Sequence, residues 1–495
     1  MKVCKFDKIE DEDKINRIIK YIINENPYVI AIPPLLPLEE KAREISIGWF
    51  REDNETVRSA IKSIEYYCYA RVDRLTANVE LQRNIKEIIS TRIKNMYAWT
   101  ENKADLLIDK TIRAEIYRLS ADLLTHCLQA QGFRSKMFDS GTFVQIDKEK
   151  NFNIPLIRES VQQYTQQNRD IDIFVIPLSL CKNIYGEIDF LSEKQNDYYA
   201  TVLAASFNAE EIILSSDFKN VHTDTHSSRE QHSLTYDEAE NLIGSGVHLL
   251  YADSITLAAR SNMVMRLVEP THFNNEHLYI SSHDSGKSIK AFLSQDSLTS
   301  VRFTSLHVLP GYLLLGKIFD IINKYQINVI SMSSSNVSIS MILSASRDTL
   351  RIIQRELYKY AETIIEEDMS VIHVIGSLHW ERPNIESEIL SVLKDIPISQ
   401  ISYGGSDNCF TLSLPTYNKN KAIDSLSKHF FSKTGCCFFH FFRNCCILRC
   451  QISMGAFRIG NTKTISLASS STSTFPIRNL LSCERMTILM SISLL

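Results

Sequence analysis

Glycine is scarce in this sequence. Only 15 of the 495 residues are glycine, about 3% against a usual level of roughly 7%. The first of them is Gly48. Any loop that holds phosphate close to the N-terminus must therefore be built without glycine, which removes the residue that most easily lets backbone amides approach a phosphate.

Long apolar runs are also missing. No run reaches the 18 residues that a bilayer-spanning helix needs, so no membrane segment is expected. The first residues, Met1 to Asp7, carry charge where a signal peptide would have its apolar stretch. These two absences predict a cytoplasmic protein.

Charge is unevenly spread. Residues 432–495 hold seven basic residues and one acidic residue, Glu484, which gives a net charge of +6. The rest of the chain carries 47 basic and 57 acidic residues, a net of −10. An acidic body repels phosphate backbones, so a nucleic-acid partner is not expected.

Cysteine and histidine patterns do not favour a metal site. Five of the 11 cysteines are scattered through the body, and six crowd into the last 60 residues without a C-x-x-C pair. His222, His226 and His232 are irregularly spaced in a polar segment, which also disfavours a metal centre. We therefore predict no metal ligands among the side chains of the chain.

The segment 432–495 differs from the rest of the chain, since its apolar runs follow neither helical nor strand periodicity. Three interpretations stay open: a translation that has drifted out of frame, a flexible or aggregation-prone tail, and a membrane-surface anchor. The coding DNA across codon 432 would distinguish the first from the others. We predict a disordered tail here.

The first half of the chain alternates strands and helices. Residues 1–6 and 28–33 are expected to be strands around a helix near 12–24, and residues 51–110 a helical insertion. Further helices are expected at 112–131, 195–207 and two within 236–263, with strands at 172–176, 211–214 and 263–267, the last closing the sheet. This order predicts an α/β domain of three layers, αβα, over residues 1–290.

The second half changes pattern near residue 299. Strands are expected at 303–309, 328–332 and 338–344, with helices at 312–324 and 347–364. Residues 371–431 repeat this order, with strands at 371–375, 398–403 and 408–414 and helices at 384–394 and 420–431. The repeat predicts two ferredoxin-like βαββαβ units in tandem, at 299–370 and 371–431.

Two segments carry the residues of interest. The first is Lys5-Phe6-Asp7-Lys8-Ile9-Glu10, and the second runs without a gap from Gly186-Glu187-Ile188-Asp189-Phe190-Leu191 to Asp197-Tyr198-Tyr199-Ala200. They resemble Lys-Phe-Gly-Gly-Thr-Ser and Gly-Arg-Thr-Thr-Thr-Leu-Gly-Arg-Gly-Gly-Ser-Asp-Tyr-Thr-Ala of the aspartokinases. These are amino-acid kinases followed by two ACT domains, and the resemblance covers nearly all of residues 1–431.

The resemblance implies catalytic roles for Lys5 and Asp197, Lys5 being the lysine that neutralises the transferring phosphoryl group. Both glycines and both hydroxyl residues beside it are replaced, and Asp7 and Glu10 bring negative charge instead. Lys8 could compensate in part. The alternative is that Lys5 is an exposed lysine at the end of a strand.

The implied substrate side is altered more strongly. The arginine that grips the carboxylate of aspartate is Glu193 here. A like-charged pair about 4 Å apart costs on the order of 4 kcal/mol at an effective dielectric constant near 20. The Gly-Glu of the family falls at Ile116-Tyr117, and Glu115 two places away is the candidate substitute.

Nucleotide and effector positions are altered as well. The resemblance implies nucleotide contacts from Asp217, Thr223 and His248, the last standing in place of a lysine. In the first ACT-like unit, Ser335-Asn336-Val337-Ser338 marks the implied regulatory segment, in which an acidic residue has become Asn336. The backbone pattern is kept there while charge recognition is lost.

Two functions follow from the resemblance. One is an aspartate kinase that transfers phosphate from MgATP to L-aspartate, the first step of lysine, threonine and methionine synthesis, with weak or no activity. The alternative is a catalytically dead pseudokinase that acts as a regulatory or dimerising ACT-domain protein, without a cofactor; a decaying gene product is a third. The resemblance also implies a homodimer formed through the ACT domains.

Overall fold

The computed structural model describes residues 1–75, 78–216, 221–223, 233–244, 249–269, 277–284, 286–306, 311–378 and 384–431. The predicted tail lies outside these residues. The first half contains an eight-stranded, mostly parallel sheet in the order β3-β4-β2-β1-β7-β10-β11-β9. Its strands are β1 (Lys2–Lys5), β2 (Val29–Ile32), β3 (Ser135–Met137), β4 (Ile173–Pro177), β7 (Glu211–Ser215), β9 (Ser233–Thr235), β10 (Val264–Val268) and β11 (His277–Ser281).

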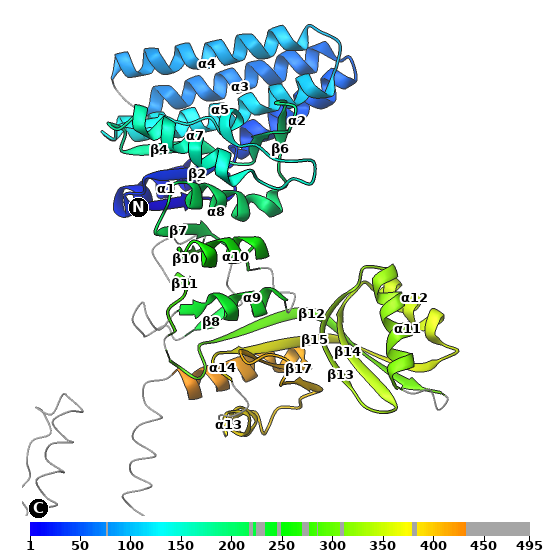
Figure 1. The fold of residues 1–495 in the computed structure, drawn as a ribbon. Coiled ribbons are helices and arrows are strands. Elements are labelled where there is room, and N and C mark those ends of the chain that lie inside the picture. Colours follow the sequence, from blue (N-terminus) through cyan, green and yellow to red (C-terminus); the bar gives the residue numbers. More distant parts are fainter. Residues whose placement is uncertain are drawn as a thin grey trace, which may run out of the picture. The chain divides into compact units, whose positions relative to one another are not determined.

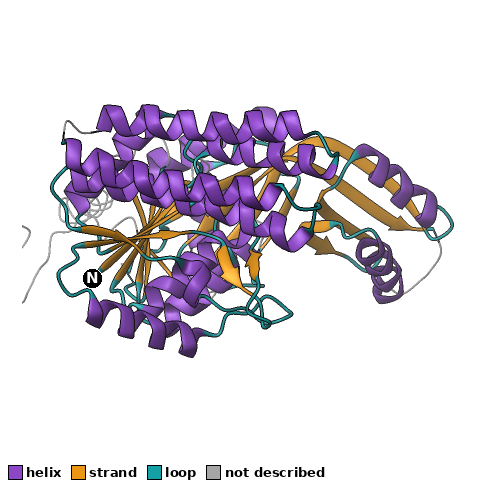
Figure 2. Ribbon diagram, turned by 90° about the horizontal axis from the view of Figure 1, so that it is seen from above, coloured by secondary structure: helices purple, strands orange, loops and turns teal. Residues whose placement is uncertain are grey.

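Helices cover both faces of this sheet, as Figure 2 shows. Successive strand residues point to opposite faces, so Val3 and Cys4 enter two different hydrophobic cores. The core with Cys4 is covered by α1 (Glu12–Glu25), α2 (Leu36–Phe50), α3 (Asn54–Leu75), α4 (Val79–Thr100) and α5 (Leu106–Ala130). The core with Val3 is covered by α7 (Ile154–Gln167), α8 (Asn196–Ser206), α9 (Tyr236–Gly244) and α10 (Ala252–Arg260). The predicted αβα layers are confirmed.

The segment predicted to be a helical insertion is helical. Helices α3 and α4 form an antiparallel pair beside α5 (Figure 1). Asn78 caps α4 and Asp105 caps α5, each side chain accepting hydrogen bonds from two backbone amides of the first turn. One prediction for this half is wrong: β10 does not close the sheet, because β11 pairs antiparallel with it and β9 extends the sheet further.

A buried ion network joins the sheet to α1. Arg266 of β10 is 5% exposed and donates two hydrogen bonds to Glu25, of 2.8 and 2.6 Å. Its Nε lies 2.9 Å from Glu211, and Lys2 donates to Glu25 at 2.8 Å. Hydrogen bonding to Arg266 outweighs burial and lowers the pKa of Glu25 to about 2. The charges of this network compensate one another within the fold.

The second half forms another sheet, with the strand order β13-β14-β12-β15-β17-β16. Its elements are β12 (Ala291–Ser305), α11 (Gly311–Lys324), β13 (Asn328–Ser334), β14 (Ser338–Ser344), α12 (Arg347–Leu357), β15 (Ala361–Ile375), α13 (Ile385–Val392), β16 (Gln400–Ser402), β17 (Cys409–Pro415) and α14 (Lys419–Phe430). Helices α11 and α12 pack on one part of this sheet, and α13 and α14 pack on the other. The ferredoxin-like order of strands appears in both parts.

The two ferredoxin-like units share their central strands. Strand β12 runs antiparallel to β15 along its length, with a register shift between Gln295 and Ser300. The later part of β12 pairs with β14, in the first unit. The earlier part pairs with the stretch of β15 that also pairs with β17, in the second unit. The units are therefore interleaved, whereas the sequence predicts them in tandem.

One helix of this half is shorter than predicted. The predicted helix 347–364 ends at Leu357, and Ala361 already begins β15. The segment 361–365 alternates between buried and more exposed residues, as a strand does. Among the described residues, no helix combines the length and the apolarity needed to cross a bilayer.

The two sheets are joined by a short strand and a buried ion pair. Strand β8 (Val221–Thr223), from the first half, pairs antiparallel with the start of β12. Next to it, Lys290 is 2% exposed and its Nζ lies 2.9 Å from a carboxylate oxygen of Glu238 on α9. The chain also passes very close to itself here, because a Cβ at Gly376 would lie 2.0 Å from the carbonyl oxygen of Ser288.

Candidate active site

The candidate site lies at the carboxyl edge of the parallel sheet. Strands β1, β2, β4 and β7 run in parallel, so the loops that follow them meet at one edge. Lys5 is the last residue of β1, and its Nζ lies 3.4 Å from the carbonyl oxygen of Ser215 at the end of β7. Asp197 stands in the first turn of α8, where the helix dipole favours a carboxylate.

Lys5 and Asp197 meet in space although 191 residues separate them. The Nζ of Lys5 donates a hydrogen bond of 2.9 Å to Asp197 and also contacts the carboxylate of Asp7. Lys5 is 5% exposed, so it is not an exposed lysine at a strand end. Burial works against the charge of Lys5, but the carboxylates of Asp197 and Asp7 prevail and raise its pKa. The lysine is therefore charged and held by two carboxylates.

Glu193 lies on the outer side of this site. It begins η1 (Glu193–Gln195), the short turn before α8, and its carboxylate is 3.4 Å from the Nζ of Lys8. The side chains of Lys8 and Glu193 are 55% and 63% exposed, so their ion pair is weak. Lys8 therefore contacts Glu193, and its partial compensation for the charges of Asp7 and Glu10 stays a prediction.

A hairpin leads into this turn and is held against α5. It consists of β5 (Leu180–Lys182) and β6 (Ile188–Phe190). Lys110 of α5 donates a 2.9 Å hydrogen bond to Asp189. One turn along the helix, the guanidinium of Arg113 lies 5.2 Å from the ring centre of Phe190. One turn further, the ring centre of Tyr117 lies 5.0 Å from the ring centre of Phe190. Three successive turns of α5 thus contact two residues of the hairpin.

Charged groups surround Tyr117. Burial raises the pKa of Tyr117 to about 12, and the charge of Glu39 adds to this effect while that of Arg113 opposes it. The carboxylate of Glu193 raises the pKa further, and Arg43 lowers it. These four charged residues come from α2, α5 and η1, so the part of the candidate site beside α5 combines charges of both signs with an aromatic pair.

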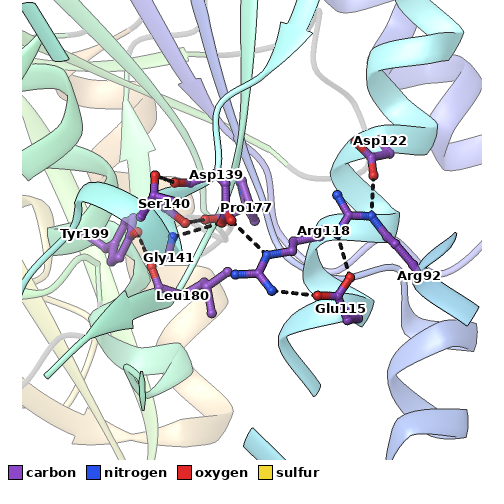
Figure 3. A network of polar contacts seen from close by, with 11 residues as sticks. Arg92, Glu115, Arg118, Asp122, Asp139, Ser140, Gly141, Pro177, Leu180 and Tyr199 are labelled. Carbon is purple, nitrogen blue, oxygen red and sulfur yellow. Dashed lines mark hydrogen bonds and ion pairs between the residues drawn. The ribbon is translucent and has the colours of Figure 1, made fainter. Parts of the chain in front are cut away.

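Glu115, the predicted substitute for the substrate-binding glutamate, is 4% exposed and lies in a buried ion network (Figure 3). Its two carboxylate oxygens accept hydrogen bonds of 2.6 Å from Arg92 and 2.7 Å from Arg118. The same arginines donate 2.8 Å hydrogen bonds to Asp122 and Asp139. The structure does not bring Glu115 together with Lys5, and a role for Glu115 in substrate binding stays a prediction.

The predicted nucleotide residues are described only in part. Asp217 and His248 lie outside the described residues, and for Thr223 only the backbone, in β8, is described. In the predicted regulatory segment, Ser335 and Ser338 hydrogen-bond each other at the turn between β13 and β14, and Val337 is 62% exposed. Asn336 is exposed at the same turn.

Metal ligands were not predicted, and His226 and His232 lie outside the described residues. Within the described part of the chain, His, Cys, Asp and Glu do not form a group of three that could hold a metal ion.

Sequence reasoning missed how Asp7 acts. Residues i and i+2 of an extended segment point to the same side, and Asp7 follows Lys5, the last residue of β1, by two positions, so this spacing was the available signal for the contact. The contact between Tyr117 and Phe190 had no such local signal, because the two residues are 73 positions apart. Only the fold reveals that α5 and the hairpin meet.

The family comparison supports the resemblance found in the sequence. Residues 70–269 match the model of the amino acid kinase family. Lysine-sensitive aspartokinase 3 of Escherichia coli is 21% identical over 260 residues, which is 50% of this chain and 58% of that protein. Chloroplastic aspartokinase 3 of Arabidopsis thaliana is 26% identical over 214 residues, 41% of this chain and 38% of that protein. The matches therefore span about half the length of these relatives.

Solved structures agree on the fold. Aspartokinase III of E. coli, in complex with lysine and aspartate, superposes with a TM-score of 0.68 at 17% identity, covering 87% of this chain and all of that one. The aspartate kinase of Clostridium acetobutylicum gives a TM-score of 0.68 at 15% identity, with 86% and 98% covered. At these identities the agreement shows a shared fold.

Proposed function

Because this chain is aspartokinase-like in sequence and fold, with an amino acid kinase family domain over residues 70–269, we propose that it is an aspartokinase relative with weak or no catalysis. The reaction at issue is transfer of a phosphoryl group from ATP to the side-chain carboxylate of L-aspartate, as the first step of lysine, threonine and methionine synthesis.

The contact between Lys5 and two carboxylates carries this proposal. A catalytic lysine stabilises the negative charge of a phosphoryl group when its own charge is free to act there. Here Asp197 and Asp7 both contact the Nζ of Lys5, so the three groups together carry a net negative charge. A phosphate oxygen about 4 Å from Asp7 would meet a repulsion of about 4 kcal/mol at an effective dielectric constant near 20. That repulsion corresponds to roughly a thousandfold in rate.

MgATP is the cofactor that the resemblance implies. The donor set fits it in part, because the carboxylates of Asp7 and Asp197 are oxygen ligands of the kind Mg²⁺ takes and Lys5 suits a phosphate. Both carboxylates already contact Lys5. Magnesium would therefore compete with the lysine for them.

Trapping of aspartyl phosphate with hydroxylamine tests the proposal. The full-length chain with L-aspartate and MgATP should give little or no hydroxamate above background. Glu193→Arg alone should not restore turnover, because Asp7 would still lie beside Lys5. Hydroxamate formation by the unaltered protein at the turnover of an ordinary kinase, about 1–100 s⁻¹, would refute the proposal, and recovery in Glu193→Arg alone would show that the phosphate side is intact.

The alternative function is that of a regulatory or dimerising protein without catalysis. The ferredoxin-like strand order of both units supports it, since each unit has its own hydrophobic core although the effector segment has lost its acidic residue. Thermal shift with MgATP tests the nucleotide site: a saturable stabilisation favours a retained site and with it a binding function. Analytical ultracentrifugation tests the homodimer that the resemblance implies.

A further inference from the structure

Three side chains join the hairpin to α5 beside the candidate site. The ring centre of Phe190 lies 5.0 Å from the ring centre of Tyr117 and 5.2 Å from the guanidinium carbon of Arg113. All three side chains are partly buried. Aromatic pairs, and guanidinium groups stacked on aromatic rings, stabilise a fold by more than the burial of their apolar area alone would give. We call Tyr117, Phe190 and Arg113 the aromatic clamp.

The clamp lies next to the charged groups of the candidate site. Glu193 follows Phe190 by three residues, and its charge reaches Tyr117. The same Glu193 contacts Lys8 at 3.4 Å, and Asp197, one turn further along, contacts Lys5. The clamp is thus continuous along the chain with the outer part of the candidate site.

Both aromatic residues of the clamp depart from the polar residues of the resembling motifs. Phe190 stands where the gap-free motif has threonine, and Tyr117 falls, by the downstream spacing along the chain, where the family has glutamate. These positions are 73 residues apart, yet the structure brings the two replacements into direct contact. Relative to the resembling motifs, a threonine and a glutamate are thus replaced by two large aromatic rings that contact each other.

Resting on the proposed function, we propose that the aromatic clamp occupies the acceptor side of the candidate site and excludes a small acidic amino acid such as L-aspartate. The rings take the volume that the ligand's backbone groups would need, and the adjacent Glu193 repels its carboxylates. Loss of aspartate binding is then steric as well as electrostatic, and reversing the charge at Glu193 alone does not restore it.

Hydrogen exchange tests whether the clamp holds the hairpin. In full-length Phe190→Thr, the backbone amides of Asp189, opposite Cys181, and Leu191, which donates to the carbonyl oxygen of Ser179, should exchange about tenfold faster than in the unaltered protein. Arg113→Gln, which leaves both rings in place, should accelerate the same amides by a smaller factor. Tyr185→Ala is the matched control, because this aromatic residue of the same hairpin is 71% exposed and lies outside the clamp. Equal exchange in Phe190→Thr and Tyr185→Ala would overturn the clamp, whether or not the protein catalyses anything.

Calorimetric titration with L-aspartate tests the exclusion. The unaltered protein and Glu193→Arg should not bind it, whereas the triple variant Tyr117→Glu, Phe190→Thr, Glu193→Arg should. Binding by Glu193→Arg alone, or no binding by a folded triple variant, would overturn the exclusion. Aspartate bound by the unaltered protein without hydroxamate formation would overturn this inference and leave the proposed function standing. Hydroxamate formation by the unaltered protein at the turnover of an ordinary kinase, about 1–100 s⁻¹, would instead refute the proposed function.

Discussion

Acid should destabilise the α/β/α half through one identified carboxylate, Glu25. Its pKa is lowered from 4.5 to about 2 in the folded protein, mainly by the hydrogen bonds from Arg266 and despite burial. A group with a lowered folded pKa stabilises the fold above its unfolded pKa, and this contribution is lost as the pH falls towards the folded value. The window therefore runs from about pH 4.5 down to about pH 2.

The magnitude follows from the size of the shift. At 1.36 kcal/mol for each pH unit, the full contribution of Glu25 is about 3 kcal/mol, and about 2 kcal/mol of it is lost between pH 6 and pH 3. In Glu25→Gln this pH-dependent part is absent. The variant should be about 3 kcal/mol less stable at pH 7, because Arg266 loses a buried partner, and its stability should fall less steeply towards pH 3.

Urea denaturation at pH 6 and pH 3 measures this difference. Tryptophan fluorescence reports mainly on this half, since two of the three tryptophans, Trp49 and Trp99, lie in α2 and α4. Other carboxylates titrate in both proteins and cancel in the comparison. Glu210→Gln is the matched control, because Glu210 pairs with the N-terminal amine but its side chain is 87% exposed. Parallel slopes for the unaltered protein and Glu25→Gln would refute the role given to Glu25.

Two further predictions concern the junction of the sheets. Gly376→Ala should prevent or severely weaken folding, because its Cβ would lie 2.0 Å from the carbonyl oxygen of Ser288. The control Gly316→Ala, on a helix with open space around the added Cβ, should keep or slightly raise the melting temperature. Equal effects of the two substitutions on the melting temperature would contradict this reasoning. Lys290→Met should lower the free energy of unfolding by about 3–5 kcal/mol, since Glu238 would remain buried without its main partner. Adding Glu238→Gln to Lys290→Met should recover part of the loss in urea denaturation, and a purely additive double variant would show that the two residues do not act as a pair.

The elements of the first half could be predicted because each has its own periodicity. Strand β4 is an unbroken apolar run, and α5 has a wide apolar face followed by Gly132, which adopts a positive φ. The continuation of the sheet beyond β10 could not be predicted in the same way. Strand β11 has only five residues and β9 only three, so their pairing depends on the edge that the sheet offers them.

The interleaving of the second half was not predictable from local pattern. The start of β12 has buried residues on both faces, which a period-of-two test does not recognise as a strand. The helix predicted at 347–364 was too long for a similar reason, because the spacing of the apolar residues after Leu357 fits the period of a helix as well as that of a strand. At the candidate site, Lys5 and Asp197 followed from the resemblance, whereas the buried position of Glu115 depends on two arginines contributed by the helices.

The shared strands constrain how this protein can change by recombination. Since β12 and β15 each serve both ferredoxin-like units, a crossover between the units would cut through the strands that both require. A donor sequence for one unit would have to match the register of the other at every paired residue. The second half is therefore inherited or lost as a whole, and changes in either unit must arise by point substitution rather than by exchange of a module.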